Sequence, residues 1–229
     1  MNYNDNELNS LEYKEAKEID KRTYFQFYFS LLKTKHMIIF TFLNCSDYNS
    51  QLIKSCFFLF SFGLYYTING LFFNDSNIHK IYEDKGKFNL LYQIPKIVYS
   101  TIISIIINSL IKYLSTTEKD IIVFKKNQKE DINNKKLKLL NCLVIKFIFF
   151  FILSFLFLIF FWLYLGCFCC VYRNTQVHLI KDTLISFGLS FIYPLVINLI
   201  PGLIRIPALK KNESNSEILY KLSKLIQLI

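Results

Sequence analysis

Long apolar stretches dominate this chain, and their lengths predict helices that cross a membrane. The clearest stretch is residues 142–171, which carry no charge after Lys146, and the next charged residue is Arg173. Because an α-helix rises about 1.5 Å per residue, this stretch can cross a hydrocarbon layer about 30 Å thick. Three other stretches approach or exceed about 20 largely apolar residues. We therefore expect four spans, at residues 52–73, 94–114, 142–171 and 183–203.

The ends of these spans carry charges and helix breakers. A lysine near a helix end can extend its long side chain to the membrane surface. We expect this of the lysines inside the spans, which are Lys54, Lys96, Lys112 and Lys146. In the fourth span, Pro194 should kink the helix and the pair Pro201-Gly202 should end it.

Residues 24–43 are apolar in two halves that flank Lys33, Lys35 and His36. Two central lysines would cost about 5–7 kcal/mol on the membrane-insertion scale, whereas ten Phe, Leu and Ile residues would contribute roughly −3 to −6 kcal/mol. This balance does not favour insertion. We expect an N-terminal amphipathic helix that lies in the membrane interface, within a cytoplasmic and interfacial region at residues 1–51.

The distribution of Lys and Arg predicts the orientation of the spans. Residues 1–51, 115–141 and 204–229 contain six, seven and five of these residues, against three in 74–93 and two in 172–182. Connecting segments rich in Lys and Arg stay on the cytoplasmic side. Both termini are therefore expected in the cytoplasm, which agrees with an even number of spans. The polar, lysine-rich segment 115–141 should be a mobile cytoplasmic connector.

The C-terminal segment 204–229 is predicted to be an amphipathic cytoplasmic tail. Ser214 and Glu217 have the spacing of a capping box at a helix N-terminus. One face of the helix that follows is apolar, with Ile218, Leu222, Leu225 and Ile229. This face could lie on the membrane or on the protein's own helices, or it could bind a partner helix.

Composition agrees with a membrane protein and excludes several other classes. Hydrophobic residues make up 53% of the 229 residues, with 24 Phe and 15 Tyr, which is more than a soluble core can absorb. Only six Gly and four Pro are present, too few for the many turns of a β-barrel. The net charge of +10 is explained by basic connectors between spans, so we expect no nucleic-acid partner.

Polar residues recur every four positions in the second and fourth spans. Steps of four follow one ridge of a helix, where small or hydroxylated residues allow close approach and interhelical hydrogen bonds. The rows are Ser100, Ser104, Asn108 and Lys112, and Ser186, Ser190, Pro194, Asn198 and Gly202. They favour helix packing. A polar conduit is the alternative, although neither row contains an acid that could relay protons. Asn69 and Tyr66 in the first span should make similar helix contacts.

Cys167, Cys169 and Cys170 form a CFCC sequence, and His178 follows eight residues after the last of them. Three thiolates and an imidazole are a ligand set for Zn or Cu(I). However, adjacent cysteines on a helix point in different directions, which makes a single tetrahedral site hard to build. We therefore expect no metal and no cofactor. No sequence signature of a nucleotide-binding loop, a serine hydrolase or a zinc protease is present, and we do not expect an enzyme.

Several phrases of the sequence resemble a multi-pass membrane region found in uncharacterised proteins of unicellular eukaryotes. They are DKRTYFQFYFSLLKTKH, DYNS, LYYTINGLFFND, IHKIYED, YQIPKIVYSTIISIIIN and NTQVHLIKDTLISFGLSFIYPLVINLIPGLIRIPAL. The resemblance covers residues 7–209 and implies no activity, cofactor or catalytic residue. It implies that the phrases DKRT, HKIYED and KDT, at the edges of the spans, are the first places to look for a shared role.

Together these patterns predict an all-α integral membrane protein: a four-transmembrane-helix bundle with membrane domain 52–203, in an endomembrane or the plasma membrane. We expect an anchor, scaffold or accessory subunit of a membrane complex, which contacts the lipid bilayer and other membrane subunits or itself. The alternative is a channel or transporter subunit that uses the polar rows of the second and fourth spans.

Overall fold

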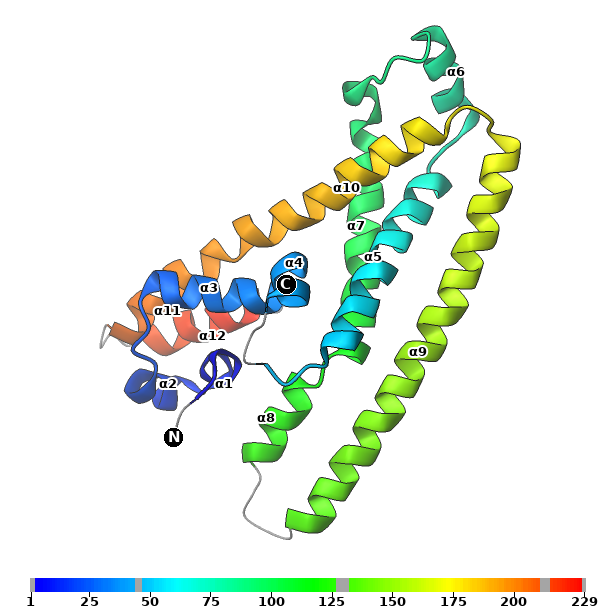
Figure 1. The fold of residues 1–229 in the computed structure, drawn as a ribbon. Helices are drawn as coiled ribbons and strands as arrows, with labels where there is room; N and C mark the ends of the chain where they lie inside the picture. Colours follow the sequence, from blue (N-terminus) through cyan, green and yellow to red (C-terminus); the bar gives the residue numbers. More distant parts are fainter. Residues whose placement is uncertain (1–2, 44–46, 127–131, 211–214, 228–229) are drawn as a thin grey trace. The chain divides into compact units, whose positions relative to one another are not determined.

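The computed structural model describes residues 3–43, 47–126, 132–210 and 215–227, and these residues form twelve α-helices and no strand (Figure 1). The chain divides into two compact units. Unit 1 contains residues 1–49, 118–123 and 191–229, and unit 2 contains residues 50–117 and 124–190. Two of the four boundaries fall inside helices, namely α8 (Glu118–Lys126) and α10 (Gln176–Ile197). The all-α prediction is confirmed for the described residues.

Three helices are long and apolar enough to cross a membrane, judged by length and composition. They are Leu90–Ser115, Asn133–Val171 and Gln176–Lys210. A fourth candidate is the pair Gln51–Leu71 and Asp75–Glu83, which is bent by 83° between its two helices. The structure therefore contains three candidate spans, or four if the bent pair is one span, and these fall on the four stretches that hydropathy predicts.

Unit 2 is built from long antiparallel helices. Helix α5 (Gln51–Leu71) packs against both α7 (Leu90–Ser115) and α9 (Ile132–Val171), and the short helix α6 (Asp75–Glu83) connects α5 to α7 (Figure 1). A cluster of Phe73, Ile81, Phe168 and Leu179 fixes the end of the unit near α6. The connector 72–89 and the turn between α9 and α10 therefore lie at the same end of unit 2.

Helix α9 packs through one narrow face. Its buried residues recur at spacings of four and seven, at Phe150, Ser154, Phe161 and Phe168. Phe161 lies against Phe60 of α5, with 6.0 Å between ring centroids. Most other large side chains of this helix are exposed, including the chain's single tryptophan, Trp162. A helix that is apolar on every side and exposed on most of them suits a lipid environment.

The connections between the predicted spans contain more helix than the sequence suggested. Segment 115–141 is largely helical, because it contains α8 and the first turns of α9. Those first turns are rich in Lys, Leu and Asn and lack Gly and Pro, so they extend a helix that is already nucleated at low cost. In addition, Pro201-Gly202 does not end a helix. Pro201 is the third residue of α11 (Leu199–Lys210), where its missing N–H has no intrahelical acceptor anyway.

The break in the fourth stretch lies at Asn198, between α10 and α11. This position is four residues after Pro194, and the Asn198 side-chain amide donates a 2.7 Å hydrogen bond to the Pro194 carbonyl. Pro194 itself is inside α10. The break lies instead within the turn before Pro201, whose missing N–H leaves the Ile197 carbonyl at the end of α10 without its helical donor.

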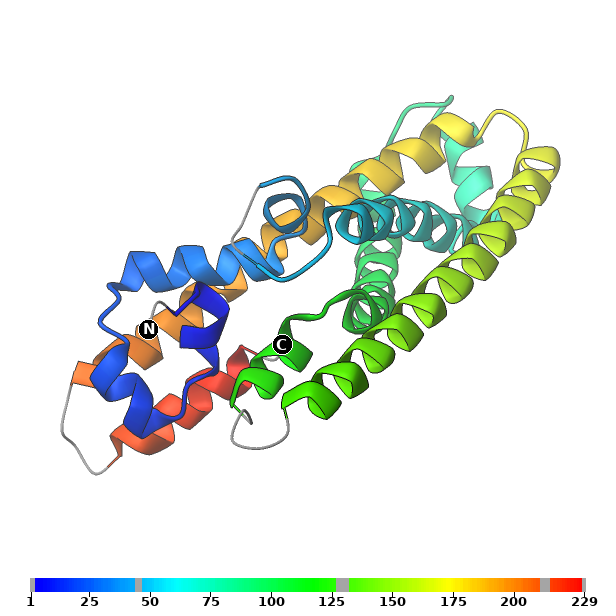
Figure 2. The same ribbon diagram turned by 60° about the horizontal axis from the view of Figure 1, so that its bottom comes forward.

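Unit 1 contains α1 (Asp5–Ser10), α2 (Tyr13–Ile19), α3 (Tyr24–Lys35), α4 (Met37–Phe42), α11 and α12 (Ser216–Ile226). Helix α11 contacts both α3 and α12. Helix α1 contacts α3, and α2 contacts α11 and α12. Three helices thus lie side by side with α11 in the middle, and α1 and α2 cover one side of them (Figure 2).

Residues 24–43 form two helices instead of the single helix that we expected. His36 ends α3, and its Nδ1 accepts a 3.5 Å hydrogen bond from the Ile39 amide at the start of α4. The imidazole therefore favours a new helix start at the polar centre of the segment. Twelve residues of α3 extend only about 18 Å, which is too short to cross a bilayer.

The predicted capping box of the tail depends on a serine that the structure does not describe. The N-cap of α12 is Asn215, whose side chain makes no capping hydrogen bond, and Ser214 and Ile229 lie outside the described residues. The predicted apolar face is present. Ile218, Leu222 and Leu225 are exposed, whereas Tyr220 and Ser223 face the protein.

Candidate functional site

The polar rows of unit 2 converge on one another inside the protein. Helix α5 contributes a third row with the same four-residue spacing as those of α7 and α10. We call the set the polar seam; its members are Ser61, Tyr65, Asn69, Lys96, Ser100, Ser104, Asn108, Asp182, Ser186 and Ser190, and every one is buried. From Lys96 to Asn108 the seam extends about 18 Å along α7.

Asn69 joins the three helices at the centre of the polar seam. Its amide nitrogen donates to the Ser186 hydroxyl of α10 at 2.6 Å and to the Tyr65 carbonyl at 2.8 Å. Its amide oxygen accepts from the Ser100 hydroxyl of α7 at 2.8 Å. A single fully buried side chain therefore bonds three helices together, and both of its polar atoms are used.

Asn108 occupies the equivalent position toward the other end of α7. Its amide oxygen accepts a 2.9 Å hydrogen bond from the Ser61 hydroxyl of α5. The Tyr65 hydroxyl, which is buried beside it, interacts with both Asn108 and Ser190. The helices are thus connected at two levels by amide and hydroxyl groups.

An ion pair between Lys96 and Asp182 closes the seam at its other end. The Lys96 ammonium also lies 3.8 Å from the ring centroid of Phe73. The prediction that Lys96 extends to the membrane surface is wrong, because a buried acid on the neighbouring helix binds it instead. The ridge of the fourth span also contains an acid, which the sequence analysis did not include in its row. Asp182 lies one turn before Ser186 on the same ridge, one residue outside the predicted span 183–203.

Some buried polar atoms of the seam have no hydrogen-bond partner among the described residues. They are the Ser104 hydroxyl, the Asn108 amide nitrogen and the second carboxylate oxygen of Asp182. Burying a polar atom without a partner costs about 1–3 kcal/mol. The seam is therefore closely bonded around Asn69 and less completely bonded at both ends.

The structure brings five of the six Ser and Asn residues of the predicted rows into the polar seam. Asn198, the sixth, belongs to unit 1 and bonds only to its own helix through the Pro194 carbonyl. Sequence reasoning grouped Asn69 with general helix contacts and did not assign it the central position. The four-residue row Ser61, Tyr65 and Asn69 in the first span is the sequence signal that marks Asn69 as a member of a polar ridge.

The cysteine-rich end of α9 does not form a metal site. Cys167 and Cys170 are exposed, Cys169 is half-buried, and all three are free thiols. His178 is buried on α10, with its ring centroid 6.1 Å from that of Phe88. Among the described residues, no three His, Cys, Asp or Glu side chains lie together in a way that could hold an ion.

Unit 1 contains a second buried polar group, which we call the charge cluster: Asp20, Arg22 and Arg205. Arg22 binds Asp20 through two nitrogens, at 2.7 and 2.9 Å, and Arg205 binds the same carboxylate at 2.8 Å. Burial disfavours the charged form of Asp20, but the hydrogen bonds and positive charges of the two arginines outweigh it, so the pKa of Asp20 lies below its usual value. The carboxylate is held ionised between two guanidinium groups.

Arg205 links the two ends of the described chain. Its guanidinium donates a 2.8 Å hydrogen bond to the Leu8 carbonyl and lies between the rings of Phe27 and Tyr220, at 4.9 and 4.7 Å. The side chain is fully buried. A planar guanidinium suits this position because it can stack on rings and form hydrogen bonds at its edge at the same time.

Comparison of the chain with protein families, with curated protein sequences and with solved structures finds no match. Any functional conclusion must therefore come from the residues themselves. Two features carry the argument. They are the polar seam in unit 2 and the charge cluster in unit 1.

Proposed function

We propose that this chain is a multi-pass integral membrane protein with a bundle of four spans, and that it acts as an anchor, scaffold or accessory subunit of a membrane complex. The observation that carries the proposal is the set of hydrogen bonds around Asn69. Both polar atoms of this amide are used in bonds, two of which join α5 to α7 and α10, so they hold helices together and line no water-filled path. Interhelical hydrogen bonds of this kind contribute about 0.6–2 kcal/mol each in a membrane.

The exposed apolar surface supports the membrane environment and a partner. Helix α9 exposes Phe155, Trp162 and Leu163 along a stretch that packs on the protein by one face only. Soluble proteins rarely expose contiguous apolar surface of such length. Lipid tails, a second copy of the chain or another membrane subunit would cover it.

The proposed orientation places both termini in the cytoplasm. The two connectors at the α6 end of unit 2, residues 74–93 and 172–182, hold five Lys and Arg residues between them. The connector 115–141 at the opposite end of the spans holds seven. This asymmetry favours the α6 end on the non-cytoplasmic side.

A co-purification experiment tests the proposed role. The tagged chain is extracted in a mild detergent, and the proteins bound to it are identified by mass spectrometry after a carbonate wash of the membranes. The proposal expects the chain to stay in the membrane pellet and to purify with a stable membrane partner or as a defined oligomer. Release by carbonate would refute the membrane assignment, and a clean monomer would refute the scaffold or accessory role.

A channel or transporter subunit is the second candidate, and the unpartnered polar atoms of Ser104, Asn108 and Asp182 favour it. A water-filled path along the seam would give these atoms partners. Single cysteines at 104, 108, 190 and 198 test it through their reaction with water-soluble thiol reagents. Modification at the first three would support a conduit, and four inert positions would exclude it. Cysteine at the exposed residue Glu83 is the positive control.

A further inference from the structure

Three helices of unit 1 turn their apolar side chains outward. Residues two positions apart on an α-helix lie on nearly opposite sides, since each residue turns the helix by about 100°. Phe27 of α3, Arg205 of α11 and Tyr220 of α12 stack on one another inside the unit. The residues two positions away therefore point outward. They are Phe25 and Phe29, Leu203, and Ile218 and Leu222, and they are 44–67% exposed.

The N-terminal segment that contains α1 and α2 covers the opposite side of these three helices, and its outer surface is polar. The carbonyls of Leu8, Ser10 and Leu11 accept hydrogen bonds from Arg205, Lys224 and Tyr220 respectively. The exposed positions of the covering segment are mostly charged, and they include Glu12, Lys14, Glu15, Lys17 and Glu18. Figure 2 shows α1 and α2 in front of α11, between α3 and α12. These five helices thus have a polar side and an apolar side.

We propose that α1, α2, α3, α11 and α12 form an interfacial module that lies on a lipid bilayer. The apolar rows of α3, α11 and α12 are immersed at the boundary between headgroups and acyl chains, and α1 and α2 face water. Helices of this kind bind a membrane through buried apolar area and through basic side chains that reach the headgroups. The inference rests on the proposed function only in requiring that the chain is inserted in a membrane.

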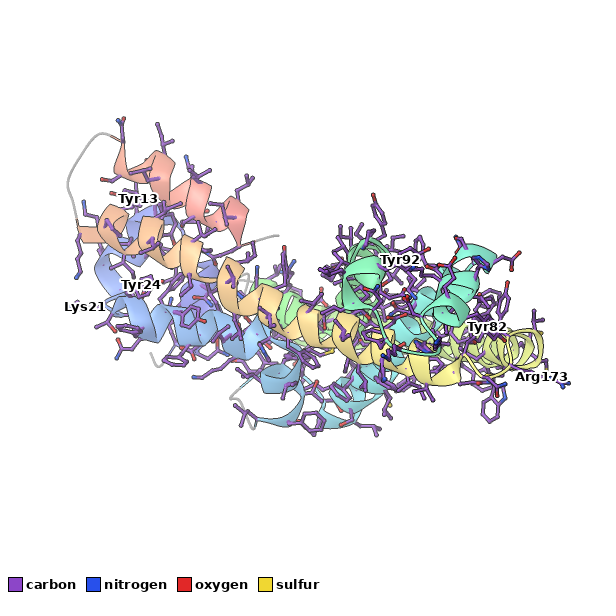
Figure 3. The ribbon with its side chains drawn as sticks, turned by 90° about the horizontal axis from the view of Figure 1, so that it is seen from above. Tyr13, Lys21, Tyr24, Tyr82, Tyr92 and Arg173 are labelled. Carbon is purple, nitrogen blue, oxygen red and sulfur yellow. The ribbon has the colours of Figure 1, made fainter. Side chains whose placement is uncertain are left out.

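A lipid surface is the occupant that the connectivity favours. Helix α11 is the last part of the candidate span Gln176–Lys210, which has 35 residues where about 20 cross the hydrocarbon layer. Its end can therefore lie at the membrane boundary, and no linker separates the apolar rows from the bilayer. Exposed lysines border the rows, at Lys21 before α3, Lys210 at the end of α11 and Lys221 on α12. Figure 3 shows Lys21 and Tyr24 at the beginning of α3 and Tyr13 beside α12.

The module also explains why the two ends of the described chain are bonded together. Tyr13 packs against Tyr220, with 5.5 Å between ring centroids, and the Asp20 carboxylate binds Arg205. Alone, α3 and α12 would each present one narrow apolar face. Held on either side of α11, they present three adjacent rows, which bury more apolar area in the interface than separate helices could in a fixed orientation.

Tryptophan fluorescence of the full chain in nanodiscs tests the proposal, because the chain contains a single tryptophan, Trp162 on α9. Variants Phe29→Trp and Leu222→Trp are made in a Trp162→Phe background, with Glu15→Trp as the matched control on α2. Each is measured with iodide in the water and with lipids that carry a nitroxide either near the headgroup or near the acyl-chain end.

The proposal expects tryptophan at 29 and 222 to be quenched several-fold more by the shallow nitroxide than by iodide, and tryptophan at 15 to show the reverse. Quenching at 29 and 222 by iodide alone would overturn it. Protection of both positions from iodide and from lipid nitroxides would also overturn it, because a protein surface would then cover the rows. Trp162 in the unmodified chain separates the two proposals. If lipid nitroxides quench Trp162 and not positions 29 and 222, only the module fails; if Trp162 is not quenched by them, the membrane assignment fails.

Discussion

Replacing Asp20 by Asn should open the N-terminal helices of unit 1. The Asp20 side chain is fully buried and compensates the charges of Arg22 and Arg205. Breaking a buried ion pair by removing one partner costs about 3–5 kcal/mol, because the remaining charge is buried without compensation. The asparagine oxygen can still accept one hydrogen bond, so we expect about 3 kcal/mol. This corresponds to an increase of about 100-fold in the opening equilibrium of the segment that the cluster holds.

Amide hydrogen exchange of the reconstituted protein measures this opening. Peptides that cover α1 and α2 should exchange about 100-fold faster in Asp20→Asn than in the unmodified chain. Glu217→Gln on α12 is the matched control, since it removes an exposed pair with Lys221 in the same unit. Solvent screens such an exposed pair, so exchange should change little.

A double variant, Asp20→Asn with Arg205→Met, makes the test specific to charge. Removing Arg205 as well takes away the fully buried charge that Asp20→Asn leaves behind, and Arg22 keeps its 3.8 Å pair with Asp5, so part of the lost protection should return. If Asp20→Asn exchanges at the rate of the unmodified chain, the charge cluster does not hold α1 and α2, and the reasoning is refuted. If the double variant is less protected than Asp20→Asn, packing and hydrogen bonds of Arg205 outweigh its charge.

Three further outcomes follow from single contacts. In Gly202→Ala the new Cβ would lie 2.8 Å from the Tyr24 ring, so we expect the variant to lose about 1–3 kcal/mol of stability, measured by thermal unfolding in detergent. Gly188 has open space around it, so the stability of the control Gly188→Ala should change little. Asn69→Ala should lower stability by about 1–2 kcal/mol, and an unchanged melting temperature would contradict its central place in the seam. Burial lowers the pKa of His36 below its usual 6.5, although hydrogen bonds to backbone oppose this. Neutral His36 therefore stabilises the fold fully above about pH 6.5, and this stabilisation is lost as the pH falls through the lowered pKa of His36 in the folded protein. In His36→Asn the capping side chain does not titrate, so the melting temperature should depend less on pH.

The sequence predicted the helices well and their contacts poorly. Apolar runs identify helices because burial or lipid exposure acts on every residue of a long segment. The four-residue rows also predicted that Ser100 and Ser186 share a role. Which row faces which depends on the rotation and relative height of two helices, and a single helix carries no information on either. For that reason the central position of Asn69 appears only in the structure.

The treatment of charges near the ends of the predicted spans accounts for the other differences between the prediction and the structure. The rule used for charges left Asp182 just outside the predicted span 183–203 and assigned Lys96, inside the second span, to the membrane surface. The rule assumes that each charge must reach water by itself. A charge that finds a partner on a neighbouring helix can lie further inside, and a partner far away in the sequence cannot be recognised from local pattern. The phrases DKRT and KDT contain Asp20 and Asp182, and both carboxylates prove to be buried ion-pair partners.

Both carboxylates belong to ion pairs that involve the long stretch Gln176–Lys210. Its Asp182 pairs with Lys96 in unit 2, and its Arg205 pairs with Asp20 in unit 1. Both charges lie near the ends of the stretch and are fully buried, so either one would be costly without its partner, because an isolated buried charge loses its hydration without compensation. Each cost is offset only when the partner segment is in place. The stretch therefore becomes stable in its final position only after both units have formed around it, so loss of either partner should impair assembly of the whole chain.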